Sequence, residues 1–120
     1  MTRRYALALD LADDPEIIAE YERHHANVWP AIEQTFRAAG IDRLEIYRAG
    51  NRLFMVMEVS PAFSFEAKAA ADAANPNVQE WERLMWTYQR ALPCARPGEK
   101  WVLLDRIYDW PRGSGASGLP

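Results

Sequence analysis

The chain has 120 residues, of which 49% are hydrophobic and 26% are charged, with a formal net charge of -3. This is the length and balance of one folded soluble domain, and it excludes a disordered chain. The slight acidic excess argues against nucleic acid and against an anionic membrane surface as partners. A single cysteine, Cys94, excludes an internal disulfide and a cysteine-based zinc site, and it agrees with a reducing cytoplasm.

The first third of the chain predicts a strand and then an interrupted helix. Side chains alternate between apolar and small or polar over residues 4–11, which is the periodicity of a strand. Acidic residues around Pro15 then begin a helix, whose apolar positions recur at steps of three and four as far as Phe36. Because Pro30 lacks a backbone donor and crowds the preceding turn, we expect a kink or a break at residues 28–29.

A hairpin is predicted next. Gly40 ends the helical pattern, and strands are expected over Arg43–Arg48 and Arg52–Val59. The tight connection Ala49-Gly50-Asn51 between them is typical of a hairpin. The second strand has no polar side over residues 53–57, so we expect it to be central and covered on both faces.

The remaining elements are two helices and a last strand. An alanine-rich helix is predicted over residues 63–74, followed by a break at residues 75–77 and a helix over residues 78–92. A loop over residues 93–98 leads to a final strand over residues 101–110.

The order β-α-β-β-α-β, with the second helix split in two, is that of a ferredoxin-like α+β sandwich. We expect residues 1–111 to form this domain and the Gly/Ser-rich residues 112–120 to form a flexible tail. Helices cover one sheet face in this fold. The other face is expected to be apolar and to be buried in a homodimer, and we assign to it Tyr5, Leu7, Met55, Met57, Trp101 and Leu103.

The only two histidines, His24 and His25, are adjacent on the first helix. Tyr21 precedes His25 by one turn and Trp29 follows it by one turn, so these three lie on the inward face. His24 is rotated by about 100° from that face, so the pair cannot readily share a metal ion, and we predict no metal site. Two interpretations of His25 stay open. Periodicity alone favours a hydrogen-bonded core histidine, and the other interpretation is a general acid or base.

A second cluster lies on the predicted helix over residues 78–92. Glu82, Trp86 and Gln89 form one stripe, in which a carboxylate and an amide lie beside an indole, while Trp81 belongs to an apolar stripe. Aromatic rings with a few polar groups suit a carbohydrate. The alternative is that the five tryptophans serve only core packing and dimer contacts.

The segment Tyr21-x-x-x-His25-x-x-x-Trp29-Pro30, in this order of elements, resembles the L-rhamnose mutarotase family. Supporting features are Gly40-Ile41, Ile46-Tyr47, the strand at residues 52–58, Trp81 with Met85, and Leu92-Pro93, so that the resemblance covers residues 4–110. It implies a cytoplasmic homodimer of ferredoxin-like subunits, a dimeric α/β barrel, with a monosaccharide as substrate. In that family the residue matching His25 is the proton donor, and the residue matching Tyr21 binds the sugar.

Two positions depart from the rhamnose enzymes, which carry a tyrosine in place of Leu44 and a second tryptophan in place of Glu82. At these two positions the chain resembles the branch of the family that is associated with L-fucose. We therefore predict an L-fucose mutarotase, with L-rhamnose as the alternative substrate. The predicted substrate-binding residues are Tyr21, Trp29, Leu44, Trp81, Glu82 and Trp86.

The chemistry agrees with these residues. Opening a hemiacetal ring requires a proton for the ring oxygen, which His25 can donate, and a group that accepts the anomeric proton. Glu82, Tyr21 or a water molecule could be that second group, and no metal or organic cofactor is required. Two other functions stay open: a cofactor-free oxygenase of the dimeric α/β-barrel type, and a sugar-binding module without catalysis.

Overall fold

The computed structural model describes residues 3–111, so the predicted tail at residues 112–120 lies outside the described part. In chain order the elements are β1 (Arg3–Leu11), α1 (Pro15–His25), α2 (Pro30–Ala39), β2 (Ile41–Ala49), β3 (Arg52–Val59), α3 (Phe65–Ala73), α4 (Pro76–Trp86), β4 (Gln89–Arg90) and β5 (Val102–Leu103).

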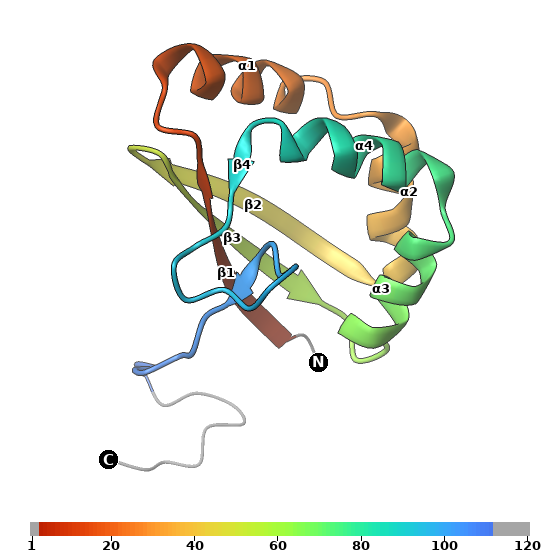
Figure 1. Cartoon of the computed structure of the whole chain (residues 1–120). Coiled ribbons are helices and arrows are strands. Elements are labelled where there is room, and N and C mark those ends of the chain that lie inside the picture. Colours follow the sequence, from red (N-terminus) through yellow and green to blue (C-terminus); the bar gives the residue numbers. More distant parts are fainter. Residues whose placement is uncertain (1–2, 112–120) are drawn as a thin grey trace.

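The strands form one antiparallel sheet in the order β2-β3-β1-β4, and β5 also pairs with β1. All four helices lie on the same side of this sheet (Figure 1). This confirms the predicted ferredoxin-like α+β sandwich, with β3 in the interior of the sheet. The core lies between the two layers, and Leu9, Leu11, Leu53, Val59 and Met85 are its most deeply buried large side chains.

Local signals in the sequence place the helix boundaries. The Asp14 carboxylate accepts a hydrogen bond from the backbone N–H of Glu16 at 2.8 Å and caps α1, and Asn75 caps α4 in the same way. Trp29 adopts a non-helical conformation directly before Pro30, which is the first residue of α2. The predicted break between α1 and α2 is therefore confirmed, because proline is readily accommodated only in the first turn of a helix.

Gly40 ends α2 in a left-handed conformation with φ 89°, and a Cβ atom there would lie 2.6 Å from Ser60 Oγ. Gly50 also has positive φ, but no atom lies within 4 Å of its Cβ position. We expect Gly40→Ala to lower the free energy of unfolding by about 2–4 kcal/mol, and Gly50→Ala by about 1 kcal/mol, because only the first combines strain with a clash. Urea unfolding midpoints measure both. Equal midpoints for the two variants would show that the Ser60 side chain moves away from the new Cβ atom without loss of stability.

The predicted helix over residues 78–92 differs from α4 at both ends. α4 already begins at Pro76, inside the predicted break at residues 75–77, because Asn75 caps it and proline is accommodated in the first turn. α4 ends at Trp86, where Thr87 Oγ1 donates to the Leu84 carbonyl at 2.6 Å and the Tyr88 N–H bonds the Met85 carbonyl at 2.9 Å. The chain then turns into β4, and Gln89 pairs with Leu11 of β1. The apolar stripe continued beyond the helix because Tyr88, in the turn before β4, is buried in the same core cluster as Trp81 and Met85.

The predicted last strand over residues 101–110 is wrong for most of its length. Only Val102 and Leu103 pair with β1, opposite Ala8 and Leu7. The fourth position of the sheet is thus divided between two short strands, β4 and β5, at successive points along one edge of β1. Residues 105–110 have no strand partner among the described residues, and this segment runs away from the body of the molecule (Figure 1).

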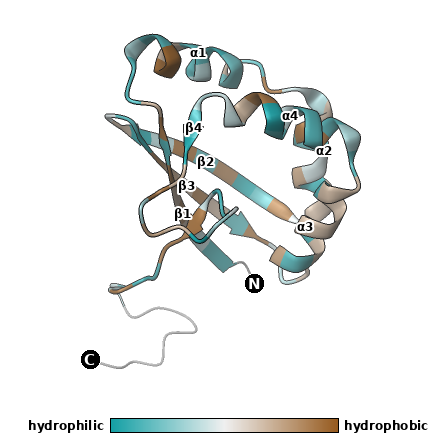
Figure 2. Ribbon diagram, in the orientation of Figure 1, coloured by the Kyte–Doolittle hydropathy of each residue, from teal (hydrophilic) through white to brown (hydrophobic). Residues whose placement is uncertain are grey.

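The predicted assignment of the sheet faces is also wrong. Leu7 and Met57 belong to the core cluster between sheet and helices, against which Tyr5, Met55 and Trp101 are packed. Leu103 pairs opposite Leu7 and so shares its face. Hydrophobic and hydrophilic residues both occur along the strands (Figure 2), and alternation separates them into two sets, but it does not indicate which set the helices cover.

The face away from the helices carries a smaller apolar set with charged residues around it. Ala6, Phe54, Val56 and Tyr47 lie on it, and Tyr47 is 55% exposed. Phe54 and Val56 are half-buried, so the prediction that β3 is covered on both faces is met on the helix side only. Among the described residues, no helix combines the length and the hydrophobicity that crossing a membrane requires.

Candidate functional site

A cavity of about 680 Å³ lies between the helices and the sheet. Its volume is in the range of small-molecule sites, and its lining combines apolar side chains with about as many polar and charged ones. The sheet contributes a floor from β2 and β3, and all four helices contribute side chains to the walls. The side chains important for the chemistry are Tyr21, His25, Leu44, Trp81, Glu82, Gln89, Lys100 and Trp101, all of which line this cavity.

His25 is the last residue of α1 and is half-buried in the cavity wall. Its Nδ1 lies 2.9 Å from the carbonyl oxygen of Tyr21. A carbonyl can only accept, so Nδ1 carries the hydrogen and Nε2 is the ring nitrogen that remains for a ligand. Burial lowers the pKa of His25, and the charge of neighbouring His24 lowers it further, although the bond to Tyr21 opposes the shift. The imidazole is therefore neutral at pH 7.

Tyr21 lies one turn before His25, and the two rings are in contact at an angle of 32°, with centroids 4.3 Å apart. The phenol is buried, and this burial raises the pKa of Tyr21 to about 12. Gln89 donates a hydrogen bond from Nε2 to the Tyr21 hydroxyl at 3.4 Å, which partly opposes that shift. Tyr21 is therefore a protonated phenol that can donate a hydrogen bond into the cavity.

Trp81 is buried and forms part of the cavity wall, with its ring edge-to-face with His25 at 5.7 Å. Trp29, which was predicted to contact substrate, lies behind this wall, packed edge-to-face on Trp81 at 5.0 Å, and does not line the cavity. It therefore supports Trp81, which is the ring that faces the cavity.

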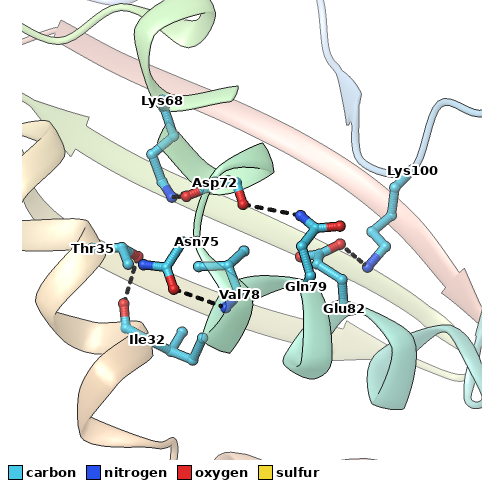
Figure 3. A network of polar contacts seen from close by, with 9 residues as sticks. All are labelled: Ile32, Thr35, Lys68, Asp72, Asn75, Val78, Gln79, Glu82 and Lys100. Atoms are coloured by element: carbon cyan, nitrogen blue, oxygen red, sulfur yellow. Dashed lines mark hydrogen bonds and ion pairs between the residues drawn. The ribbon is translucent and has the colours of Figure 1, made fainter. Parts of the chain in front are cut away.

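Glu82 lies on α4 next to Trp81 and forms an ion pair with Lys100 from the loop before β5 (Figure 3). The Lys100 side chain is only 12% exposed, and its ammonium also lies 4.8 Å from the centroid of the Trp86 ring. Trp86 does not line the cavity, so its place is on the outer side of this ion pair. The pair therefore gives the cavity one anionic and one cationic group in fixed positions.

The floor of the cavity is apolar. Leu44 on β2 lies opposite Met57 on β3, and Ile46 lies opposite Met55, with all four side chains on the helix side of the sheet. The cavity thus combines polar groups on its helix walls with an apolar part of the floor on β2 and β3. A sugar, with hydroxyls on its edge and C–H groups on its faces, matches this division.

The structure brings five of the seven predicted site residues to one cavity and leaves Trp29 and Trp86 outside its lining. Lys100 was not predicted, since no pattern in the chain marks it, and Gln89 was predicted only as part of a polar stripe and not as a site residue. His24 points elsewhere and bonds the Tyr88 hydroxyl through Nε2 at 3.1 Å. Within residues 3–111, no three histidine, cysteine or acidic side chains are grouped so as to hold a metal ion.

Comparison with known proteins agrees with this geometry. The sequence profile of the L-rhamnose mutarotase family matches residues 4–110. An L-fucose mutarotase from Xanthomonas campestris pv. campestris is 48% identical over 108 residues, covering 88% of this chain and 86% of that protein. An L-rhamnose mutarotase from Shigella flexneri is 29% identical over 86 residues, covering 70% of this chain and 75% of that protein.

A solved structure agrees at the level of the fold. The crystal structure of an L-rhamnose mutarotase from Formosa agariphila superposes with a TM-score of 0.67 at 20% sequence identity. The match covers 89% of this chain and 97% of that one. At this identity the comparison supports the fold alone, and the site must be argued from its own residues.

Proposed function

The chain belongs to the L-rhamnose mutarotase family, and from this premise we propose that it interconverts the α and β anomers of L-fucose. The observation that carries the proposal is the neutral His25, whose Nε2 has no hydrogen-bond partner within residues 3–111 and which lines a cavity that the Tyr21 phenol also lines. Under this proposal residues 1–111 act as one cytoplasmic mutarotase domain.

Ring opening needs one group to take the anomeric proton and another to protonate the ring oxygen. A neutral imidazole with a lone pair on Nε2 accepts the proton from the anomeric hydroxyl, and the protonated Tyr21 phenol donates to the ring oxygen. The C1–O5 bond then breaks and leaves an aldehyde. After rotation about C1–C2, ring closure reverses both transfers, and the imidazolium of His25 returns its proton to O1.

This assignment differs from the expectation that His25 donates a proton to the ring oxygen, because here Tyr21 donates to that atom. Because burial lowers the pKa of His25, the imidazole begins the ring-opening step as an acceptor. It is the donor in the closing step. Two positioned proton transfers of about 10²–10⁴-fold each are a sufficient contribution, because mutarotation already proceeds in water.

The choice of L-fucose rests on the 48% identical relative and on the two departures from the rhamnose enzymes. Leu44 and Glu82 both line the cavity, so either can influence which sugar binds. Glu82 uses one carboxylate oxygen on Lys100, and the other is an acceptor for a sugar hydroxyl. L-Rhamnose, which differs in the orientation of the C2 and C4 hydroxyls, is the alternative substrate.

Polarimetry tests the proposal. Freshly dissolved crystalline α-L-fucose relaxes to its anomeric equilibrium slowly in water, and micromolar protein is expected to shorten this relaxation in proportion to protein concentration. L-Rhamnose and L-galactose, measured alongside, show whether the acceleration is selective. Binding of L-fucose without any acceleration would identify a sugar-binding module in place of an enzyme. If the protein neither accelerates anomer exchange nor binds L-fucose, the oxygenase interpretation would be favoured.

We further propose that the protein is a homodimer, with a corrected interface. The sheet face opposite the helices carries Phe54, Val56 and Tyr47, and residues 104–110 carry further exposed apolar side chains, of which Ile107 is 95% exposed and Trp110 is 76% exposed. A second copy of the chain would cover both. Obligate interfaces usually bury more than about 2,000 Å² in total.

Sedimentation velocity is expected to give a dimer at micromolar concentration. Replacing Val56 by aspartate, which places a charge at the centre of the proposed interface, is expected to give a monomer. A wild-type monomer at the same concentration would contradict the proposal. The matched control is Ala69→Asp, which places the same charge at an exposed position of α3 on the helix side of the sheet, where the dimer should persist.

A further inference from the structure

Gln89 is a buried polar residue that the proposed mechanism does not fully use. It is 3% exposed and lines the cavity. Its amide donates from Nε2 to the Tyr21 hydroxyl, but its Oε1 is buried without a hydrogen-bond partner among the described residues. An unpaired buried acceptor is costly and uncommon in folded proteins, so it calls for an explanation.

The backbone holds Gln89 firmly. It is the first residue of β4 and pairs with Leu11 of β1, while the Ala12 N–H bonds the carbonyl of Tyr88 at 2.9 Å just before it. A side chain on a paired strand keeps its position better than one on a loop, as a group that reads a ligand should. The short strand β4 therefore places this amide at a fixed point of the cavity wall.

The orientation of the amide defines what it can bind. Because Nε2 is used on Tyr21, the atom left for a ligand is the acceptor Oε1. The hydrogen of the Tyr21 hydroxyl is then free to point into the cavity. The two side chains together provide one acceptor and one donor, which matches a sugar hydroxyl next to an ether or ring oxygen.

We propose that Gln89 is a sugar-binding residue whose Oε1 accepts a hydrogen bond from a non-anomeric ring hydroxyl of the substrate. This inference rests on the proposed function and extends it to a residue outside the predicted set. It also makes Gln89 a positioning residue for Tyr21, since one amide bonds both the phenol and the sugar.

The test compares wild-type protein, Gln89→Met and Gln79→Met. Methionine keeps the length and volume of glutamine but removes both polar groups. Gln79 is a matched control, because it is an exposed glutamine on α4 that donates to the Asp72 carbonyl at 2.9 Å (Figure 3) and does not line the cavity. The exchange rate constant per enzyme is measured by NMR on L-fucose and on its 2-, 3- and 4-deoxy and deoxyfluoro analogues, at sugar concentrations below saturation.

We expect Gln89→Met to lower the exchange rate constant on L-fucose by about 10–100-fold and Gln79→Met to leave it unchanged. Removing the hydroxyl that Gln89 binds should lower the exchange rate constant of wild-type protein by about tenfold. The same removal should lower the rate constant of Gln89→Met by less than about threefold. The deoxyfluoro sugar at that position should lose as much as the deoxy sugar, because fluorine cannot donate a hydrogen bond. Unchanged near-ultraviolet circular dichroism of Gln89→Met shows that the fold is retained.

The contrary outcomes are distinct. In one outcome, wild-type protein exchanges L-fucose, and each deoxy sugar lowers the rate constant equally in wild-type protein and in Gln89→Met. This would overturn the role of Gln89 and leave the mutarotase function standing. A deoxyfluoro sugar that keeps its rate would show that the amide donates, which contradicts the acceptor role. No exchange by wild-type protein on any of the sugars would overturn the proposed function itself, and this inference with it.

Discussion

His25→Ala is expected to lower the protein-dependent rate of L-fucose anomer exchange by about 10²–10⁴-fold, because it removes the Nε2 atom that takes and returns the anomeric proton. His25 is half-buried at the end of α1, where its bond to the Tyr21 carbonyl is not needed to complete the helix. The variant should therefore stay folded. Exchange is measured by NMR at equal protein concentrations. A variant that is folded and fully active would return His25 to a structural role.

His24→Ala is the matched control for this prediction. His24 is the neighbouring histidine, and it bonds the Tyr88 hydroxyl and does not line the cavity, so exchange should change little. The pH profile gives a second readout. Since the pKa of His25 is lowered from its usual 6.5, the neutral acceptor persists at pH 7, and the rate should fall only as the pH drops through that lowered pKa. A rate that rises in this range would show that the imidazolium starts the reaction.

Combining Leu44→Tyr with Glu82→Trp is expected to move the preference from L-fucose toward L-rhamnose by about 10–100-fold in the ratio of exchange rates. Both side chains line the cavity. The first change adds a polar contact above the sheet floor, and the second removes a carboxylate acceptor. The fucose-to-rhamnose ratio is measured on the folded double variant by the same NMR experiment. An unchanged ratio would mean that specificity lies elsewhere in the cavity.

Glu82→Gln separates the contribution of charge from that of shape. The glutamine keeps an acceptor but leaves Lys100 without its carboxylate, so the L-fucose preference should weaken while exchange persists. Loss of exchange with unweakened L-fucose binding would instead identify Glu82 as a catalytic base.

Much of the fold could be predicted because its signals are local. Alternation predicted β1, and Pro30 with Gly40 predicted the boundaries of α2. The fourth strand could not be predicted, because it consists of β4 and β5, two segments of two residues that pair along one edge of β1. Strands this short have no periodicity, and only the tertiary partner defines them.

The candidate site divides in the same way. His25 and Tyr21 could be predicted to lie together, since i and i+4 positions share a helix face. Lys100 could not, because its approach to Glu82 depends on the path of the loop before β5. Glu82 and Gln89 were predicted to lie on one stripe of a helix, but the helix ends at Trp86, before Gln89. Both residues nevertheless line the cavity. Their proximity comes from the turn between α4 and β4.

The central claim is that this protein catalyses exchange between the anomers of L-fucose in the cavity beside His25. Saturation transfer measures this directly: the anomeric proton of α-L-fucose is irradiated, and the loss of the β signal is followed with wild-type protein at micromolar concentration. We predict a clear loss with wild-type protein, a smaller one with L-rhamnose in place of L-fucose, and none with His25→Ala. A β signal that is as strong with wild-type protein as without it would contradict the claim.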